Sequence, residues 1–176
     1  MKILSSYKVR IKGASSVFDE TLRLYRNAVE FFIDVINHRW ETDFSSCRNQ
    51  NDAVRLAERL CHSTAKRPMV EFDFARHFYK FPSYLRRAAI AQAYGSVSSY
   101  WSRLNLWKAN PQGKEPGKPK AGHIFPALYR DNMYRRTGRE TARLKVFIRN
   151  TWDWIDIGLR KTDVDYIAKY CSARKE

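Results

Sequence analysis

The residue types best suited to chemistry in this sequence are cations interleaved with aromatics. They occur in "RHFYKF" (76–81), in Arg86–Arg87 and in "YRDNMYRRTGR" (129–139). Lys and Arg neutralise phosphates and release counterions, while Phe, Tyr and Trp offer flat faces to unstacked bases. We therefore expect a nucleic-acid-binding surface in which phosphate contact is the main interaction. For any single aromatic a place in the core is the stronger expectation, because aromatics fill most of a small core.

The distribution of charge favours the same expectation. The 176 residues include 33 Lys and Arg against 18 Asp and Glu, a net charge of +15. Residues 76–149 contain 16 Lys and Arg and three acids, so this segment carries +13 of the excess. A localised basic excess is typical of a surface that binds a polyanion, most often nucleic acid. A basic surface kept for solubility is the alternative.

Residues 108–122, "KANPQGKEPGKPKAG", form a cationic segment that we call the strap. Its Pro and Gly content excludes a helix or a strand, so we expect an extended connection. Lys114, Lys118 and Lys120 would contact a phosphate backbone from it. A solvated linker without such contacts is the alternative.

Patterns for metal binding and nucleophilic catalysis are weak. Cys61 and His62 are adjacent, but no second pair stands at zinc-ligand spacing. Neither a G-x-S-x-G motif nor the spacing of a phosphate-binding loop occurs. We predict no catalytic residue, no metal and no cofactor.

One motif, "WIDIGLRK" (154–161), is superficially like the opening strand of an RNase H-like nuclease. Asp156 would then be a metal ligand, but such a site needs further carboxylates from separate elements. Asp163 and Asp165 are expected to cap a helix instead. We expect Asp156 to face solvent beside Arg149 or Lys161.

Apolar periodicity predicts strands at both ends of the chain. In "YKVRIK" (7–12) apolar and basic residues alternate, which predicts a strand with one buried and one cationic face. Alternation over 144–149 and 154–159, with a turn at Asn150–Thr151, predicts a β-hairpin. Residues 125–136 are expected to contribute an earlier strand.

Between these strands the spacing predicts helices. Apolar residues recur every three or four positions over 16–38 and over 84–107, the latter capped by Ser83. A shorter helix is expected to carry Val54, Leu56, Leu60 and Cys61 and to stop before Pro68, and a last one to begin at Thr162. The first strand has no strand near it in sequence, so it must pair with the C-terminal ones.

This order predicts an α+β fold, an antiparallel β-barrel-like module with an inserted α-helical lobe. The expected parts are residues 1–13 as the first strand, 14–117 as the helical insertion and 118–176 as the rest of the β module. Three cysteines without pairing motifs and no apolar run of membrane-spanning length favour the cytoplasm. We expect no membrane contact, and association with the bacterial nucleoid when nucleic acid is bound.

Taken in order, several segments resemble the N-terminal part of TnpB-type transposon-encoded proteins and their relatives, the type V CRISPR effectors. The strap lies among these segments, and the others are "YKVRIKG" (7–13), "ETLRLYRNAVEFFIDVIN" (20–37), "RRAAIAQAYGSVSSYWSRLNLW" (86–107), "FPALYRDNMY" (125–134) and "RLKVFIRNTWDWIDIGLRKTDVDYI" (143–167). The resemblance implies a β-barrel wedge domain interrupted by a helical recognition lobe. Such parts hold guide RNA, the guide–target heteroduplex and a short motif in duplex DNA.

Members of that family continue into an RNase H-like nuclease domain with Asp–Glu–Asp ligands, and by this resemblance we expect those carboxylates to lie beyond the C-terminus of the sequence. We therefore expect a non-catalytic chain that binds a structured guide-type RNA, double-stranded DNA, and a second copy of itself or a full-length relative. Two alternatives stay open: a complete metal-dependent nuclease using Asp156, and a protein-binding regulator from a decayed mobile element. The expected nucleic-acid-binding residues are Lys8, Arg10, Lys12, Arg76, Lys80, Arg86, Arg87, Lys114, Lys118, Lys120, Tyr129, Arg130, Arg135 and Arg136.

Overall fold

The computed structural model describes residues 7–13, 16–128 and 131–171, and it has an α+β fold. By contacts the chain divides into two units. The β unit comprises Met1–Glu20 and Leu128–Glu176, and the helical unit comprises Thr21–Ala127. These boundaries lie further along the chain than those expected after residues 13 and 117.

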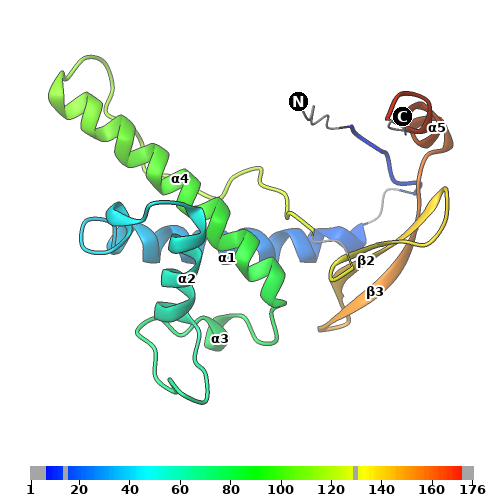
Figure 1. The fold of residues 1–176 in the computed structure, drawn as a ribbon, viewed down its shortest axis with the longest axis horizontal. Coiled ribbons are helices and arrows are strands. Elements are labelled where there is room, and N and C mark those ends of the chain that lie inside the picture. Colours follow the sequence, from blue (N-terminus) through cyan, green and yellow to red (C-terminus); the bar gives the residue numbers. More distant parts are fainter. Residues whose placement is uncertain (1–6, 14–15, 129–130, 172–176) are drawn as a thin grey trace, which may run out of the picture. The chain divides into compact units, whose positions relative to one another are not determined.

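The helical unit is built on three longer helices, a four-residue helix and a 3-10 turn (Figure 1). In chain order they are α1 (Asp19–His38), the 3-10 turn η2 (Phe44–Ser46), α2 (Gln50–Cys61), α3 (Phe74–His77) and α4 (Ser83–Ala109). Both long helices predicted from the apolar spacing are present. Pro82, not Ser83, occupies the position before α4, so the expected Ser cap is wrong.

Small residues allow α2 and α4 to pack closely. Ala53 and Ala57 on α2, and Ala89 and Ala93 on α4, are all fully buried. α1 also buries an apolar stripe, which includes Val29 and Phe32. Because the alanine side chain is a single methyl group, the backbones of the two helices can approach closely. The 27-residue α4 and the 12-residue α2 therefore share one core.

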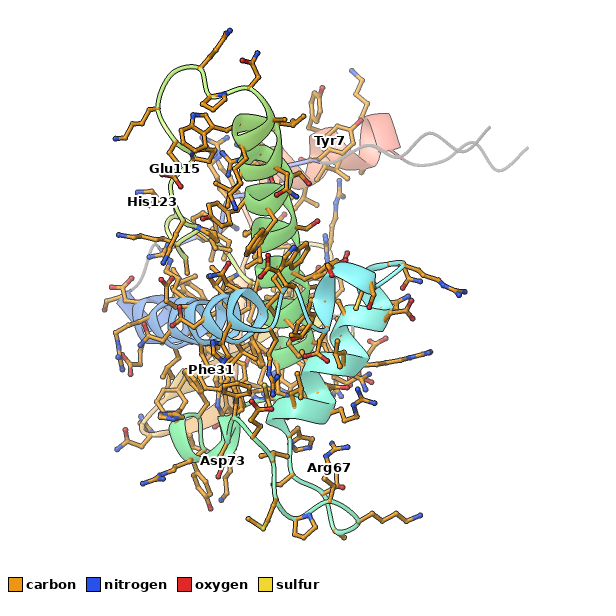
Figure 2. All side chains as sticks on the ribbon, turned by 90° about the vertical axis from the view of Figure 1, so that its left-hand side faces the viewer. Tyr7, Phe31, Arg67, Asp73, Glu115 and His123 are labelled. Carbon is orange, nitrogen blue, oxygen red and sulfur yellow. The ribbon has the colours of Figure 1, made fainter. Side chains whose placement is uncertain are left out.

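The C-terminal end of the strap and the residues that follow it contact α1. The amide of Ala121 donates to Glu30 Oε2 at 2.5 Å, and Arg26 Nε donates to the Ile124 carbonyl at 3.2 Å. The Arg26 guanidinium also lies over the Phe125 ring, 5.8 Å from its centroid. Figure 2 labels Glu115 in the strap and His123 just after it, both beside α4. The end of the strap and the residues just after it are therefore fixed to α1, while most of the strap is exposed.

The β unit contains a three-stranded antiparallel sheet of order β1-β2-β3. Its strands are β1 (Tyr134–Arg136), β2 (Thr141–Ile148) and β3 (Thr151–Gly158), followed by α5 (Lys161–Cys171). The predicted hairpin is present as β2 and β3, which are drawn as long paired arrows in Figure 1. Its turn is Arg149–Asn150, one residue earlier than expected. Both residues have positive φ, 49° and 59°, which suits a two-residue turn between twisted strands.

One face of this sheet is covered by the core of the β unit. The buried cluster consists of Ala142, Leu144, Val146, Ile157, Leu159 and Val164. Val9, Ile11 and Phe18 pack against it from the N-terminal segment and from the 3-10 turn η1 (Ser16–Phe18). Residues on alternate positions of β2 and β3 must therefore point to the opposite side.

Two details of the predicted β module are corrected. The sheet is open, so the described residues form no closed barrel. The first segment pairs with the C-terminal region as expected, but only through a bridge between Ile11 and Leu159. Two backbone hydrogen bonds flank it, from Lys12 to Gly158 at 2.7 Å and from Arg160 to Arg10 at 2.8 Å.

The strand expected within 125–136 is also shorter than predicted. Only Tyr134–Arg136 is a strand, and residues 129–130 lie outside the described part of the chain. None of the helices in the described ranges is both long and apolar enough to cross a membrane.

Candidate nucleic-acid interface

The face of the sheet opposite the core carries cations and aromatic rings. We call it the outer face and define it by Arg135, Arg143, Lys145, Phe147, Trp152, Trp154 and Asp156. The register brings these residues together in cross-strand pairs, namely Arg135 with Arg143, Arg143 with Asp156, Lys145 with Trp154, and Phe147 with Trp152. Each is at least partly exposed. The alternation that buries Leu144 and Ile157 therefore also creates a polar and aromatic surface.

Contacts across the strands hold these side chains in place. The Arg135 guanidinium lies over Trp154, 4.8 Å from the ring centroid, and its Nε donates to the Asp131 carbonyl at 3.0 Å. Phe147 and Trp152 meet edge to face, with centroids 5.4 Å apart and planes inclined by 65°. A guanidinium held over an indole keeps N–H groups at its edge for an anion, so phosphate contact and ring stacking are available at one place.

Carboxylates neutralise part of the charge at this face. Asp156 Oδ1 lies 3.2 Å from Arg143 Nε. Lys12 reaches the same side of the sheet, since its side chain lies 3.3–3.7 Å from the position that a Cβ on Gly158 would occupy. Its Nζ contacts Glu140 Oε2 at 3.0 Å. Both pairs are exposed, so competition from phosphates can open them at small cost.

The other two cations of the N-terminal segment differ in their contacts with the rest of the chain. Lys8 is exposed, as expected. Arg10 is engaged with the start of α5, because Asp163 accepts hydrogen bonds from Arg10 Nε, Nη2 and backbone N at 2.7–3.0 Å. These bonds hold the pKa of Asp163 well below its usual range. Asp163 therefore joins two segments, which corrects its expected role as a simple helix cap.

Arg136 is also used within the fold. Its Nε donates to the Gly138 carbonyl at 2.7 Å, and its Nη2 donates to the Arg139 carbonyl. Arg136 thus stabilises the turn between β1 and β2 and does not share the outer face with Arg135. Nearby, Arg139 pairs with Asp165 at 2.6 Å, so Asp165 too is an ion-pair partner. Tyr129 and Arg130 lie outside the described residues.

Arg86 and Arg87 connect two helices of the helical unit. Both donate to Glu58 on α2, with Nη2 of Arg86 at 3.2 Å and Nε of Arg87 at 3.1 Å. Arg86 is only 8% exposed, so its expected contact with nucleic acid is wrong for this structure. Partial burial alone would raise the pKa of Glu58, but hydrogen bonds from Arg87 and Arg86 leave it lowered.

The aromatics of residues 72–81 belong mainly to the core. Phe74 stacks on Phe32 and on Phe78, with centroids 4.9 and 4.6 Å apart. Phe31 contacts the same cluster from the side of α1 that faces α3 (Figure 2). Phe74 is buried, so the expectation of a core role is confirmed for it, whereas Phe78 is only partly buried.

The remaining predicted cations of the helical unit are exposed. Arg76 lies on α3, and Lys80 lies over the ring of Tyr79 at 5.1 Å. The three strap lysines, Lys114, Lys118 and Lys120, are exposed as well. These residues are accessible to phosphates, and their role stays a prediction.

Asp156 has a setting that suits an ion pair better than a metal site. Its side chain is 78% exposed, and its partner is Arg143, not Arg149 or Lys161. Among residues 7–13, 16–128 and 131–171, no three His, Cys, Asp or Glu side chains gather closely enough to hold a metal ion.

The sequence-based set included Arg135 but missed most of the outer face. Lys145, Phe147 and Trp154 were assigned to strand positions without a function, and Arg143 and Trp152 lay outside the predicted strands. A signal was present, since the non-core positions of both hairpin strands read R-K-F and W-W-D. Recognising it required attention to the face that does not fill the core.

The chain belongs to the Aq_aa04 family, whose sequence profile matches residues 5–148. This range includes the helical unit, β1 and β2, and it ends before β3. One relative is the uncharacterized protein aq_aa04 of Aquifex aeolicus (strain VF5), which is 31% identical over 133 residues. The similarity covers 70% of this chain and 74% of the relative. No solved structure matches the chain.

Proposed function

We propose that this chain is a non-catalytic nucleic-acid-binding module that uses the outer face, with RNA as its first ligand and duplex DNA as its second. The observation that carries the proposal is the convergence of cations from separate segments onto one aromatic sheet face. Lys12 is far in sequence from Arg135 and Lys145, which lie on neighbouring strands, and all three reach one side of the sheet. Cations beside partly exposed rings suit phosphates and bases together.

The charge of the whole chain supports the same proposal. A net charge of +15 attracts any polyanion over a distance and speeds its encounter with the protein. The resemblance to TnpB-type proteins suggests a more specific ligand, a structured guide-type RNA with adjacent duplex DNA. In that case a full-length relative would supply the catalytic domain, and this chain, alone or with a second copy of itself, would contribute only binding.

Salt dependence tests the proposal with a matched pair of variants. A labelled RNA is titrated with the chain at several salt concentrations and followed by fluorescence anisotropy. We expect Arg135→Ala/Lys145→Ala to lower affinity roughly tenfold and to reduce the slope of log K against log salt by about 1.5, since each lost phosphate contact removes about 0.7 to 0.9.

Arg55→Ala/Lys66→Ala is the control, because it removes the same charge from exposed positions of the helical unit. It should change the affinity only slightly. Absence of RNA binding by the native chain, or an equal loss in both variants, would contradict the proposal. Mg²⁺-dependent cleavage of the RNA that Asp156→Asn abolishes would support the nuclease alternative instead.

A further inference from the structure

The spacing of flat groups on the outer face discriminates between paired and unpaired nucleic acid. Trp152 and Trp154 are two residues apart on β3, so they lie on the same side of the strand. Positions two residues apart in a strand are separated by about 6.8 Å. Successive bases of a stacked duplex rise by only about 3.4 Å along each strand. A duplex therefore cannot place neighbouring bases on these two rings, whereas an unstacked strand can extend to reach both.

Each of the two positions presents a planar group with a supporting contact. At the first position, the ring of Trp152 contacts the ring of Phe147 edge to face. At the second, the Arg135 guanidinium already lies over Trp154. Bases stack on guanidinium planes as well as on aromatic rings, so the Arg135–Trp154 pair serves as the second platform.

Cations alternate with these platforms across the sheet. Lys145 is the direct cross-strand neighbour of Trp154, and Arg143 lies one row further along β2, beside Arg135 on β1. A strand that stacks its bases over β3 can therefore direct its phosphates toward β2 and β1. Duplex DNA would contact the same cations only through its backbone and would leave the rings unused.

We infer that the outer face binds an unpaired stretch of RNA, with two neighbouring bases stacked on Trp152 and on the Arg135–Trp154 pair. This inference rests on the proposed function and adds the strand state of the ligand. It also assigns a binding role to Trp152 and Trp154.

The test compares one RNA in its two states. A labelled RNA of roughly 12 nucleotides without self-complementarity is titrated alone and after annealing to its complement. We expect the single strand to bind roughly tenfold more tightly than the duplex. Trp154→Leu and Trp152→Leu should each weaken single-strand binding by roughly 5- to 100-fold and leave duplex binding unchanged. Trp154→Phe should retain most of the affinity, because it keeps an aromatic ring.

Circular dichroism checks that each variant is folded. If Trp154→Leu does not fold, the comparison is made with Trp152→Leu alone. Tyr79→Leu is the control, since it removes a ring that is 76% exposed in the helical unit. Equal affinity for the two states in the native chain overturns the inference and leaves the proposed function standing. An unchanged single-strand affinity in the folded Trp variants also overturns it. Failure to bind either state contradicts the proposed function itself.

Discussion

Replacing Glu58 with Gln is expected to destabilise the helical unit by about 3 kcal/mol. The substitution leaves Arg86 without its carboxylate partner, and the Arg86 side chain is only 10% exposed. Arg86 Nε is already buried without a hydrogen-bond partner among the described residues, so nothing there compensates for the lost pair. Urea unfolding followed by the far-UV circular dichroism of the helices measures the change.

The acid dependence of the same variant provides a second readout. The folded-state pKa of Glu58 is lowered, so its contribution to stability is complete above the ordinary Glu value near 4.3. That contribution is lost as the pH falls through the lowered folded-state pKa. The difference between native chain and Glu58→Gln should therefore shrink in acid. Glu41→Gln, at an exposed position, is the control. If Glu58→Gln were as stable as the native chain at neutral pH, the ion pairs of Glu58 with Arg86 and Arg87 would not contribute to the stability of the helical unit.

Phe74→Ala is expected to cost about 4 kcal/mol of the stability of the helical unit. Phe74 is 2% exposed and lies between the stacked rings of Phe32 and Phe78, with Phe81 at its edge. Truncation removes these contacts and leaves a cavity that the surrounding rings cannot easily fill. Thermal or urea unfolding by circular dichroism gives the change in free energy.

Tyr79→Ala, five residues further along, is the comparison for Phe74→Ala. Tyr79 is exposed, and its removal should change stability by less than about 0.5 kcal/mol. A small effect of Phe74→Ala would contradict the aromatic core and would reopen the assignment of residues 72–81 to nucleic-acid binding. A large effect would support restricting that assignment to the exposed Arg76 and Lys80.

Local patterns in the sequence predicted the elements of this fold well. The apolar spacing of α1 and α4 and the alternation of β2 and β3 depend on neighbouring residues, and their ranges agree with expectation to within a few positions. In the structure the same alternation places Leu144, Val146 and Ile157 on the buried side. The turn at Arg149–Asn150 was misplaced by one residue, because polarity alone does not reveal positive φ.

Long-range ion pairs could not be predicted in this way. Arg10 and Asp163 are separated by 153 positions, and Glu58 lies 28 positions from Arg86. Their pairing depends on tertiary packing, which no local spacing encodes. As a result, four of the cations expected to contact phosphate, Arg10, Lys12, Arg86 and Arg87, are engaged with carboxylates of the chain. The outer face was missed for a related reason, since its residues meet only once the register of β1, β2 and β3 is known.

Ultraviolet crosslinking of bound RNA, followed by mass spectrometry of the peptides, tests the central claim most directly. The claim is that the outer face of the sheet is where nucleic acid binds. We expect crosslinks concentrated in residues 141–158, at Phe147, Trp152 and Trp154. Crosslinks confined to the helical unit, with none between Thr141 and Gly158, would contradict it.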